Sequence, residues 1–184
     1  MAETLLRINR LAALSGALAR ARTLSMSKDS QRFEQTLALP GLADTQALGA
    51  RIAASLKVGD AVALQGDLGA GKTTLARAIL SALGVREEVP SPTFTLVQNY
   101  ETAGLNVRHY DLYRIERPGD VEELGLDEAL DDGAALIEWP ERALGWMPAD
   151  RLHVTLSLMD SGRRADIRGP ARWKAALAGL DHVG

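Results

Sequence analysis

The residues best suited to chemistry in this chain form one short loop, Gly66-Asp67-Leu68-Gly69-Ala70-Gly71-Lys72-Thr73. The loop matches the GxxxxGK[ST] pattern, whose glycines allow successive backbone N–H groups to face one anion. We expect Lys72 to reach the outer phosphates of a bound nucleotide, and the Thr73 hydroxyl to hold Mg²⁺. The pattern therefore predicts a phosphate-binding site rather than a plain glycine-rich turn.

Two carboxylates stand at the ends of predicted strands. Asp111 lies in His109-Tyr110-Asp111-Leu112-Tyr113-Arg114, and Glu138 follows the apolar run Ala134-Ala135-Leu136-Ile137. Phosphate-loop enzymes need an acid opposite the loop to hold Mg²⁺, and some need another to polarise the attacking water. An acid after a strand can also be a turn former or a helix cap. Position alone therefore leaves the roles of Asp111 and Glu138 open.

The aromatic and histidine residues near these acids, and elsewhere in the chain, could have either structural or site roles. Trp139 places a large ring beside the Glu138 carboxylate, or else completes the core. We interpret His109 as a strand residue that points away from the site rather than as a base or a ligand. His153 and His182 have no spacing that indicates a metal site.

The elements around the loop come in the order that phosphate binding requires. Ala61-Val62-Ala63-Leu64 is a continuous apolar run that predicts a buried parallel strand before the loop. After the loop, Leu75, Ile79 and Leu83 fall on one face of a predicted helix, and Gly84 is placed to end it. The helix would add the positive end of its dipole to the site.

The remaining chain predicts a mixed sheet with helices packed on it, in one α/β domain. Hydrophobic alternation, prolines and turn residues place strands at 33–39, 93–100, 105–112, 134–137, 152–158 and 165–168. Helices are predicted at 45–56 with Asp44 as the cap, at 121–124, at 126–130, and from Pro170 to Leu180. Two of the strand pairs have short connections that favour hairpins. The predicted fold is a mixed β-sheet flanked by helices, as in P-loop NTPases, with ligands at the carboxyl ends of the strands.

Composition limits the classes of function. With 184 residues and 46% hydrophobic content, the chain is long enough for one sizeable core. The net charge of −3 offers no broad basic surface for direct contact with nucleic acid, so a partner would have to carry any RNA. The absence of cysteine excludes disulfides and thiolate chemistry and is consistent with a cytoplasmic protein. Charges interrupt the longer apolar stretches, so we expect no membrane span.

The first segment differs in charge from the rest. Residues 1–28 contain five basic residues and one acid. A targeting peptide can have this composition, but we interpret residues 1–31 as a basic, poorly ordered extension of the domain, with Met26 as an alternative start. The predicted P-loop ATPase domain then covers residues 32–170, and residues 171–184 form a C-terminal helix or tail.

Four segments taken together resemble one family. The loop with Thr74, the segments 91–97 and 109–114, and Ile137-Glu138-Trp139-Pro140 resemble the TsaE (YjeE) family in sequence, order and interval, over roughly residues 33 to 168. Members of that family are the small bacterial ATPase of the machinery that forms N6-threonylcarbamoyladenosine in tRNAs reading codons that begin with A. The resemblance implies a Mg²⁺-dependent ATPase, weak alone, that acts on a complex of TsaD-like and TsaB-like subunits and meets tRNA only through them.

The resemblance also implies roles for individual residues. The residues implied to surround ATP are Asp67, Leu68, Gly69, Ala70, Gly71, Lys72, Thr73, Thr74, Asp111 and Arg163. Thr73 and Glu138 would hold Mg²⁺, and Lys72, Asp111 and Glu138 are the implied catalytic residues. The stretch with Ser91, Thr93 and Thr95 resembles a switch-like segment, in which Thr93 would sense the γ-phosphate.

Two other classes of phosphate-loop protein are alternatives to this one. A small-molecule kinase needs an arginine-rich lid, for which Arg163, Arg164 and Arg168 are the available residues. A GTP-dependent switch needs a base-reading motif of the NKxD kind, and no such tetrapeptide occurs in the chain. The kinase is therefore the alternative to the ATPase.

Overall fold

The computed structural model describes residues 32–143 and 145–180, so the predicted extension 1–31 lies outside the described residues. The strands are β1 (Arg32–Leu39), β2 (Ala61–Gln65), β3 (Val97–Glu101), β4 (Asn106–Asp111), β5 (Gly133–Glu138), β6 (Leu152–Leu158) and β7 (Arg163–Pro170). The helices are α2 (Leu42–Ala53), α3 (Lys72–Ala82), α4 (Leu126–Asp132) and α5 (Arg172–Ala176), with the 3₁₀ segments η1 (Pro118–Leu124) and η2 (Pro140–Arg142).

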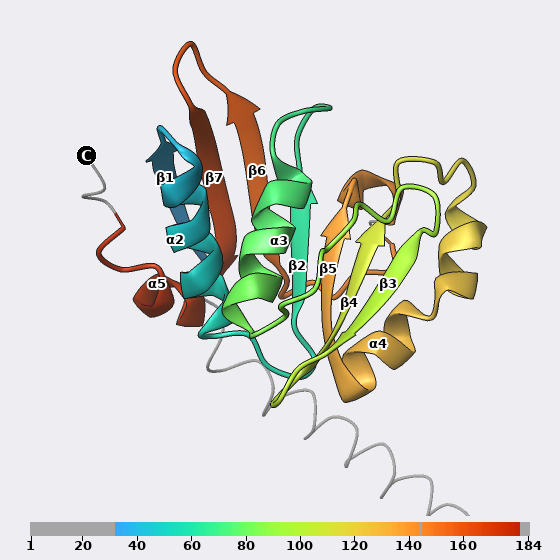
Figure 1. Cartoon of the computed structure of the whole chain (residues 1–184). Coiled ribbons are helices and arrows are strands. Elements are labelled where there is room, and N and C mark those ends of the chain that lie inside the picture. The colour runs from blue at the N-terminus through green and yellow to red at the C-terminus, as the bar shows by residue number, and fades with distance from the viewer. Residues whose placement is uncertain (1–31, 144, 181–184) are drawn as a thin grey trace, which may run out of the picture.

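All seven strands form one mixed sheet in the order β1-β7-β6-β2-β5-β4-β3 (Figure 1). The four central strands β6, β2, β5 and β4 are parallel, and β1, β7 and β3 are added antiparallel at the two sides. The two predicted hairpins, β3–β4 and β6–β7, are confirmed. The parallel strands β2, β4 and β5 therefore end at the same edge of the sheet, where the loop after β2 lies.

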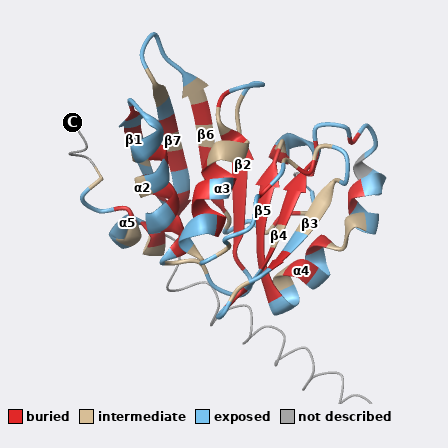
Figure 2. Cartoon of the chain, viewed as in Figure 1, coloured by how far each residue is buried: buried red, intermediate tan, exposed pale blue. Residues whose placement is uncertain are grey.

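The strands β2 and β5 in the middle of the sheet are buried on both faces, because helical layers cover both sides of them (Figure 2). Along β2, Val62 and Leu64 join a larger core with α2, α3 and α5, whereas Ala61 and Ala63 join a smaller one with α4, η1 and the segment after β5. This division follows from the alternation of side chains along a strand. β2 and the loop after it are thereby supported from both sides.

Helix α3 is held against the sheet by close contact with α2. At Gly49 of α2, an added Cβ would lie 2.5 Å from the Ala78 Cβ atom of α3, a distance too short for two carbon atoms. A glycine at this position lets the two helices approach closely enough to bury Leu48, Ile52 and Ile79. The packing fixes the N-terminus of α3, and with it the loop.

Three local predictions were wrong in detail. Asp44 is not the cap of α2: Gly41 is, and Asp44 stands inside the first turn, where its carboxylate accepts from the Gly41 N–H at 2.7 Å. The strand predicted at 93–100 begins only at Val97, because residues up to Leu96 form a turn and Leu96 has φ of 64°. Pro170 ends β7 instead of starting a helix, and α5 is short.

The short helix α5 is nonetheless part of the core. Its Trp173 and the following Leu177 are fully buried beneath the face that α2 and α3 also cover. Within residues 32–143 and 145–180, none of the helices has the length and apolar content needed to cross a membrane.

Candidate functional site

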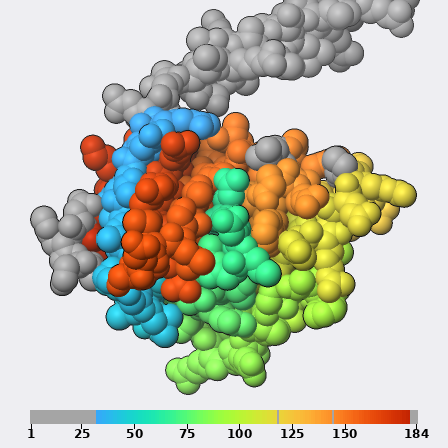
Figure 3. Space-filling view, turned by 90° about the horizontal axis from the view of Figure 1, so that it is seen from above, coloured from blue at the N-terminus to red at the C-terminus, as the bar shows by residue number. Residues whose placement is uncertain are grey.

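The loop between β2 and α3 has the backbone that its sequence predicts. Gly66, Gly69 and Gly71 have φ of 143°, 82° and 107°, which L-residues with a Cβ rarely adopt. Gly71 is the N-cap of α3 and makes no side-chain capping bond, so the first N–H groups of the helix are not capped by a side chain. In the view from above, the loop lies in the middle of the molecule, between the β6–β7 turn and the segments after β4 and β5 (Figure 3). Its outer residues Asp67, Leu68 and Gly69 are exposed, whereas Ala70 is buried.

Lys72 is folded back onto its own loop. Its Nζ donates to the carbonyl oxygens of Gly66 at 2.7 Å and Asp67 at 2.9 Å, and lies 4.0 Å from the centre of the Trp139 ring. The side chain is 5% exposed, and this burial lowers the pKa of Lys72, an effect that the carboxylates of Glu138 and Asp111 partly oppose. The Lys72 ammonium is shielded from water and its hydrogen-bond partners are uncharged carbonyls, so it is well placed to bind an anion.

Thr73, Glu138 and His109 form a chain of hydrogen bonds across three elements. Thr73 Oγ1, in the first turn of α3, donates to Glu138 Oε2 at 3.0 Å. The other carboxylate oxygen, Oε1, lies 2.9 Å from Nε2 of His109 on β4. Glu138 is 2% exposed and His109 is completely buried. The hydroxyl and carboxylate oxygens expected to bind Mg²⁺ are therefore adjacent.

Asp111 holds the segment that precedes β3. Its Oδ2 accepts hydrogen bonds from Thr93 Oγ1 at 2.6 Å and Ser91 Oγ at 3.1 Å, and its Oδ1 accepts from the Tyr113 N–H at 3.1 Å. Asp111 and Glu138 are paired in the β4–β5 register, so both carboxylates stand at the same edge. Thr95, the third predicted switch-like residue, is exposed on the same turn.

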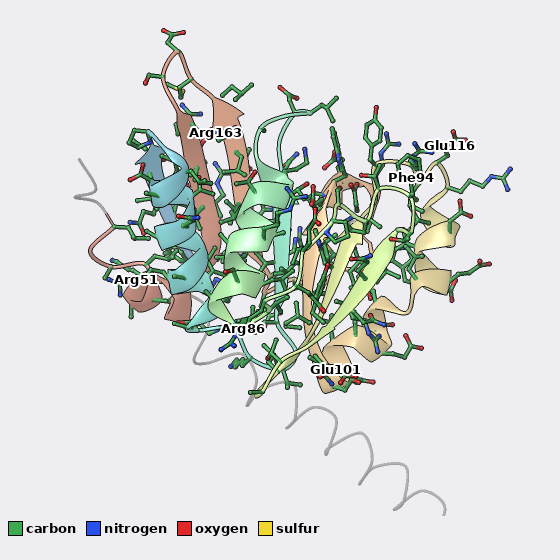
Figure 4. The ribbon with its side chains drawn as sticks, in the orientation of Figure 1. Arg51, Arg86, Phe94, Glu101, Glu116 and Arg163 are labelled. Carbon is green, nitrogen blue, oxygen red and sulfur yellow. The ribbon has the colours of Figure 1, made fainter. Side chains whose placement is uncertain are left out.

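Arg163 contacts the loop from β7, and Thr74 lies in the first turn of α3. Arg163 lies at the start of β7 (Figure 4). Its Nε donates to the Ala70 carbonyl oxygen at 2.8 Å, and a Cβ at Gly71 would come within 2.8 Å of the same nitrogen. Thr74 lines a cavity between α2 and α3 with Leu42 and Arg77. The structure thus brings Arg163 to the loop, whereas Thr74 lines the cavity between α2 and α3.

The residues present fit Mg²⁺ held together with a phosphate group. A hydroxyl and a carboxylate are hard oxygen donors of the kind that Mg²⁺ prefers. Among the described residues no group of three or more histidine, aspartate or glutamate side chains is arranged to hold a metal alone. Mg²⁺ is commonly bound by one or two protein oxygens with water and substrate phosphates, so this sparse set suits it.

The prediction that His109 points away from the site was wrong. His109 and Asp111 are two residues apart on one strand, so their side chains share a face of the sheet, and this face carries Glu138 as well. The period-two spacing was visible in the sequence. The pairing of Trp139 with Lys72 was not, because it depends on the positive φ of 57° at Trp139.

His153 on β6 contacts Gln65, the last residue of β2, with its Nε2 lying 2.7 Å from Gln65 Oε1. Burial first, then Arg151 and Arg168, lowers the pKa of His153 below its ordinary value of 6.5. Below that pH the unfolded chain binds more protons than the folded one, so stability is lost as the pH falls. We expect the free energy of unfolding of His153→Gln, measured with urea, to fall less between about pH 7 and pH 5 than that of the unsubstituted chain. Parallel pH profiles would contradict this expectation.

The fold and the loop define an α/β protein with a GxxxxGK[ST] loop between a buried parallel strand and a helix. The family model described as "Threonylcarbamoyl adenosine biosynthesis protein TsaE" matches residues 39–165. This chain belongs to the TsaE family of tRNA threonylcarbamoyladenosine biosynthesis proteins. The family and the mixed α/β fold that the sequence predicts are thereby confirmed.

Individual relatives agree with the family model. The TsaE protein of Rickettsia felis is 41% identical over 122 residues, which are 66% of this chain and 71% of that protein. The TsaE protein of Bacillus subtilis is 40% identical over 114 residues, 61% of this chain and 71% of that protein. The crystal structure of YdiB from Bacillus subtilis matches with a TM-score of 0.64 and 29% identity, covering 82% of this chain and 94% of that one.

Proposed function

We propose that the protein binds and hydrolyses ATP with Mg²⁺, and that this activity serves N6-threonylcarbamoyladenosine formation in tRNAs that read codons beginning with A. It would act on a complex of TsaB-like and TsaD-like subunits. The observation that carries the proposal is the convergence of Lys72, Thr73 and Glu138 at one loop in a chain of the TsaE family. Electropositive N–H groups, an ammonium and oxygen ligands for Mg²⁺ are the parts that phosphoryl transfer requires.

Different residues of the chain have different roles in binding the phosphate groups. Lys72 exchanges its two carbonyl partners for phosphate oxygens, and the N–H groups of the loop and of the first turn of α3 stabilise negative charge on the same group. Arg163 keeps the Ala70 end of the loop in place. Mg²⁺, held by Thr73 and Glu138, supplies further charge stabilisation when bound.

Asp111 links the site to the segment 91–96. Ser91, Thr93 and the Tyr113 N–H take up three of its roughly four acceptor sites, so little capacity is left to position water in this arrangement. A rearrangement of the segment, or a residue supplied by the partner complex, would have to release it. This gives a physical reason to expect slow hydrolysis by the chain alone.

The arginines available for a kinase lid have other partners. Arg164 pairs with Asp166 at 2.9 Å, Arg168 with Glu34 at 3.3 Å, and Arg163 with the loop itself. All three arginines stand on β7, a strand of the sheet, rather than on a lid segment, which favours the partner-dependent ATPase over the kinase alternative.

The proposal is tested by phosphate release from Mg-ATP, measured for the purified chain alone and after adding the cognate TsaB–TsaD pair. We expect slow release that rises with the pair. Release that is indifferent to the pair would contradict the partner-dependent function and direct attention to metabolite phosphorylation. Trace contamination is controlled by Lys72→Ala, which should show no release in either condition.

A further inference from the structure

The His109 side chain is buried below the Glu138 carboxylate and has no role in the activity proposed so far. In the β4–β5 register His109 stands opposite Leu136, and Asp111 stands opposite Glu138. His109 is therefore one step further from the edge than the two carboxylates, on the same face. No part of its side chain is exposed, so it cannot touch a nucleotide directly.

The polar contact that the ring makes is with Glu138. Nε2 lies 2.9 Å from Glu138 Oε1, and Nδ1 is among the buried atoms that have no hydrogen-bond partner within the described residues. A carboxylate in its charged form only accepts hydrogen bonds, so the tautomer that fits this contact carries its proton on Nε2 and donates from it. A histidine retained in the core for its own hydrogen bonds would be expected to satisfy both nitrogens.

This contact determines how Glu138 is presented. Each carboxylate oxygen has one partner: Oε1 faces His109, and Oε2 faces the Thr73 hydroxyl. Glu138 is only 2% exposed, so a carboxylate oxygen without a hydrogen-bond donor would cost free energy. The side chain would then rotate to find a donor. With Oε1 held from below, Oε2 is left directed at the loop.

We propose that His109 is a positioning residue of the magnesium site, which holds the Glu138 carboxylate so that Oε2 stays beside Thr73. The inference rests on the proposed function, because the proposed function assigns the binding of Mg²⁺ to Glu138. It adds a residue that contacts neither metal nor nucleotide and acts through a ligand. Such supporting hydrogen bonds commonly change metal affinity by about 10- to 100-fold.

The test compares His109→Gln with His109→Asn. The longer amide of glutamine can place its N–H near the position of Nε2, whereas the amide of asparagine is too short to reach Glu138. For each variant we would measure the Kd of ADP in EDTA and in Mg²⁺ by calorimetry and take their ratio as the magnesium effect. We expect the effect to fall by about tenfold or more in His109→Asn and to be largely retained in His109→Gln, with the Kd in EDTA unchanged in both.

Several outcomes would overturn the inference. They are an unchanged magnesium effect in His109→Asn, an equal loss in both variants, or a loss of ADP affinity in EDTA as large as that in Mg²⁺. Combining His109→Asn with Glu138→Ala completes a double-mutant cycle. In the Glu138→Ala background, the histidine substitution should have no further effect on the ratio of the two ADP Kd values. If the unsubstituted chain shows no magnesium effect at all, the magnesium part of the proposed function fails as well, so the two failures are distinguishable.

A second measurement needs no substitution and guards against a variant that does not fold. Long-range ¹H–¹⁵N correlation spectra of the intact chain report which ring nitrogen of His109 carries the proton. We expect a protonated Nε2 whose signal moves when Mg²⁺ is added to the ADP complex. A bare Nε2, or a signal that Mg²⁺ leaves unmoved, would overturn the inference.

Discussion

Replacement of Lys72 by alanine is expected to abolish tight ATP binding while leaving the fold intact. The buried ammonium that now donates to two loop carbonyls would no longer be available to the phosphates, and a hydrogen bond in which a charged group takes part is worth about 1.5–3 kcal/mol. The expected fall in affinity is therefore on the order of 100-fold or more. Isothermal titration of ATP into the unsubstituted chain and into Lys72→Ala measures it.

The fold should tolerate this change because burial of Lys72 disfavours its charged form, as the lowered pKa indicates. A thermal melt should therefore differ little between the two chains. Lys174→Ala is the matched control, since Lys174 is exposed on α5 and away from the loop. Equal ATP affinity in Lys72→Ala, or an equal loss in Lys174→Ala, would remove Lys72 from the site.

Loss of the Glu138 carboxylate is expected to suppress Mg²⁺-dependent hydrolysis. In Glu138→Ala and Glu138→Gln, Thr73 loses its carboxylate partner and the site loses a negatively charged oxygen ligand. We expect ATP turnover to fall on the order of 100-fold and the Mg²⁺ dependence of nucleotide binding to weaken, with little change in binding in EDTA. Single-turnover phosphate release at several Mg²⁺ concentrations, with the partner complex present, measures both effects.

The two variants separate chemistry from folding. Glu138→Ala leaves the buried His109 Nε2 without its acceptor, so this variant should also be less stable, whereas Glu138→Gln preserves the volume of the side chain. Glu101→Gln is the control, because Glu101 is an exposed carboxylate at the end of β3 and is not among the charges that act on Lys72. Unchanged Mg²⁺-dependent turnover in both Glu138 variants would exclude Glu138 as a ligand.

The segment before β3 shows where the local pattern was misleading. Alternation favoured a strand from Thr93, but the side chains of Ser91 and Thr93 instead bind Asp111, which lies 18 residues beyond Thr93. The chain must then turn at Leu96 to enter β3, and its positive φ is stabilised by hydrogen bonds of the turn, including Leu96 N–H to the Pro92 carbonyl at 2.6 Å. Phe94 is left 82% exposed, with the Arg114 guanidinium stacked on its ring. A distant carboxylate, not local propensity, decides this conformation.

The phosphate loop was predictable from sequence because its determinants are contiguous. Glycine at 66, 69 and 71 supplies backbone angles that other residues resist, and Lys72 and Thr73 follow at once. The same applies to the buried strand before the loop and the amphipathic helix after it, whose side-chain periods are local. Resemblance of four motifs in series then identified the family.

Only the tertiary structure decided which side chains meet. The spacing of His109 and Asp111 indicates that they share a face, but not which face, nor that the β4–β5 register brings both to Glu138. Likewise, the contact of Arg163 with Ala70 joins the start of β7 to the loop after β2, 93 positions away in the chain. Such contacts depend on sheet order and register, which arise from the packing of the whole core rather than from any short stretch of the chain.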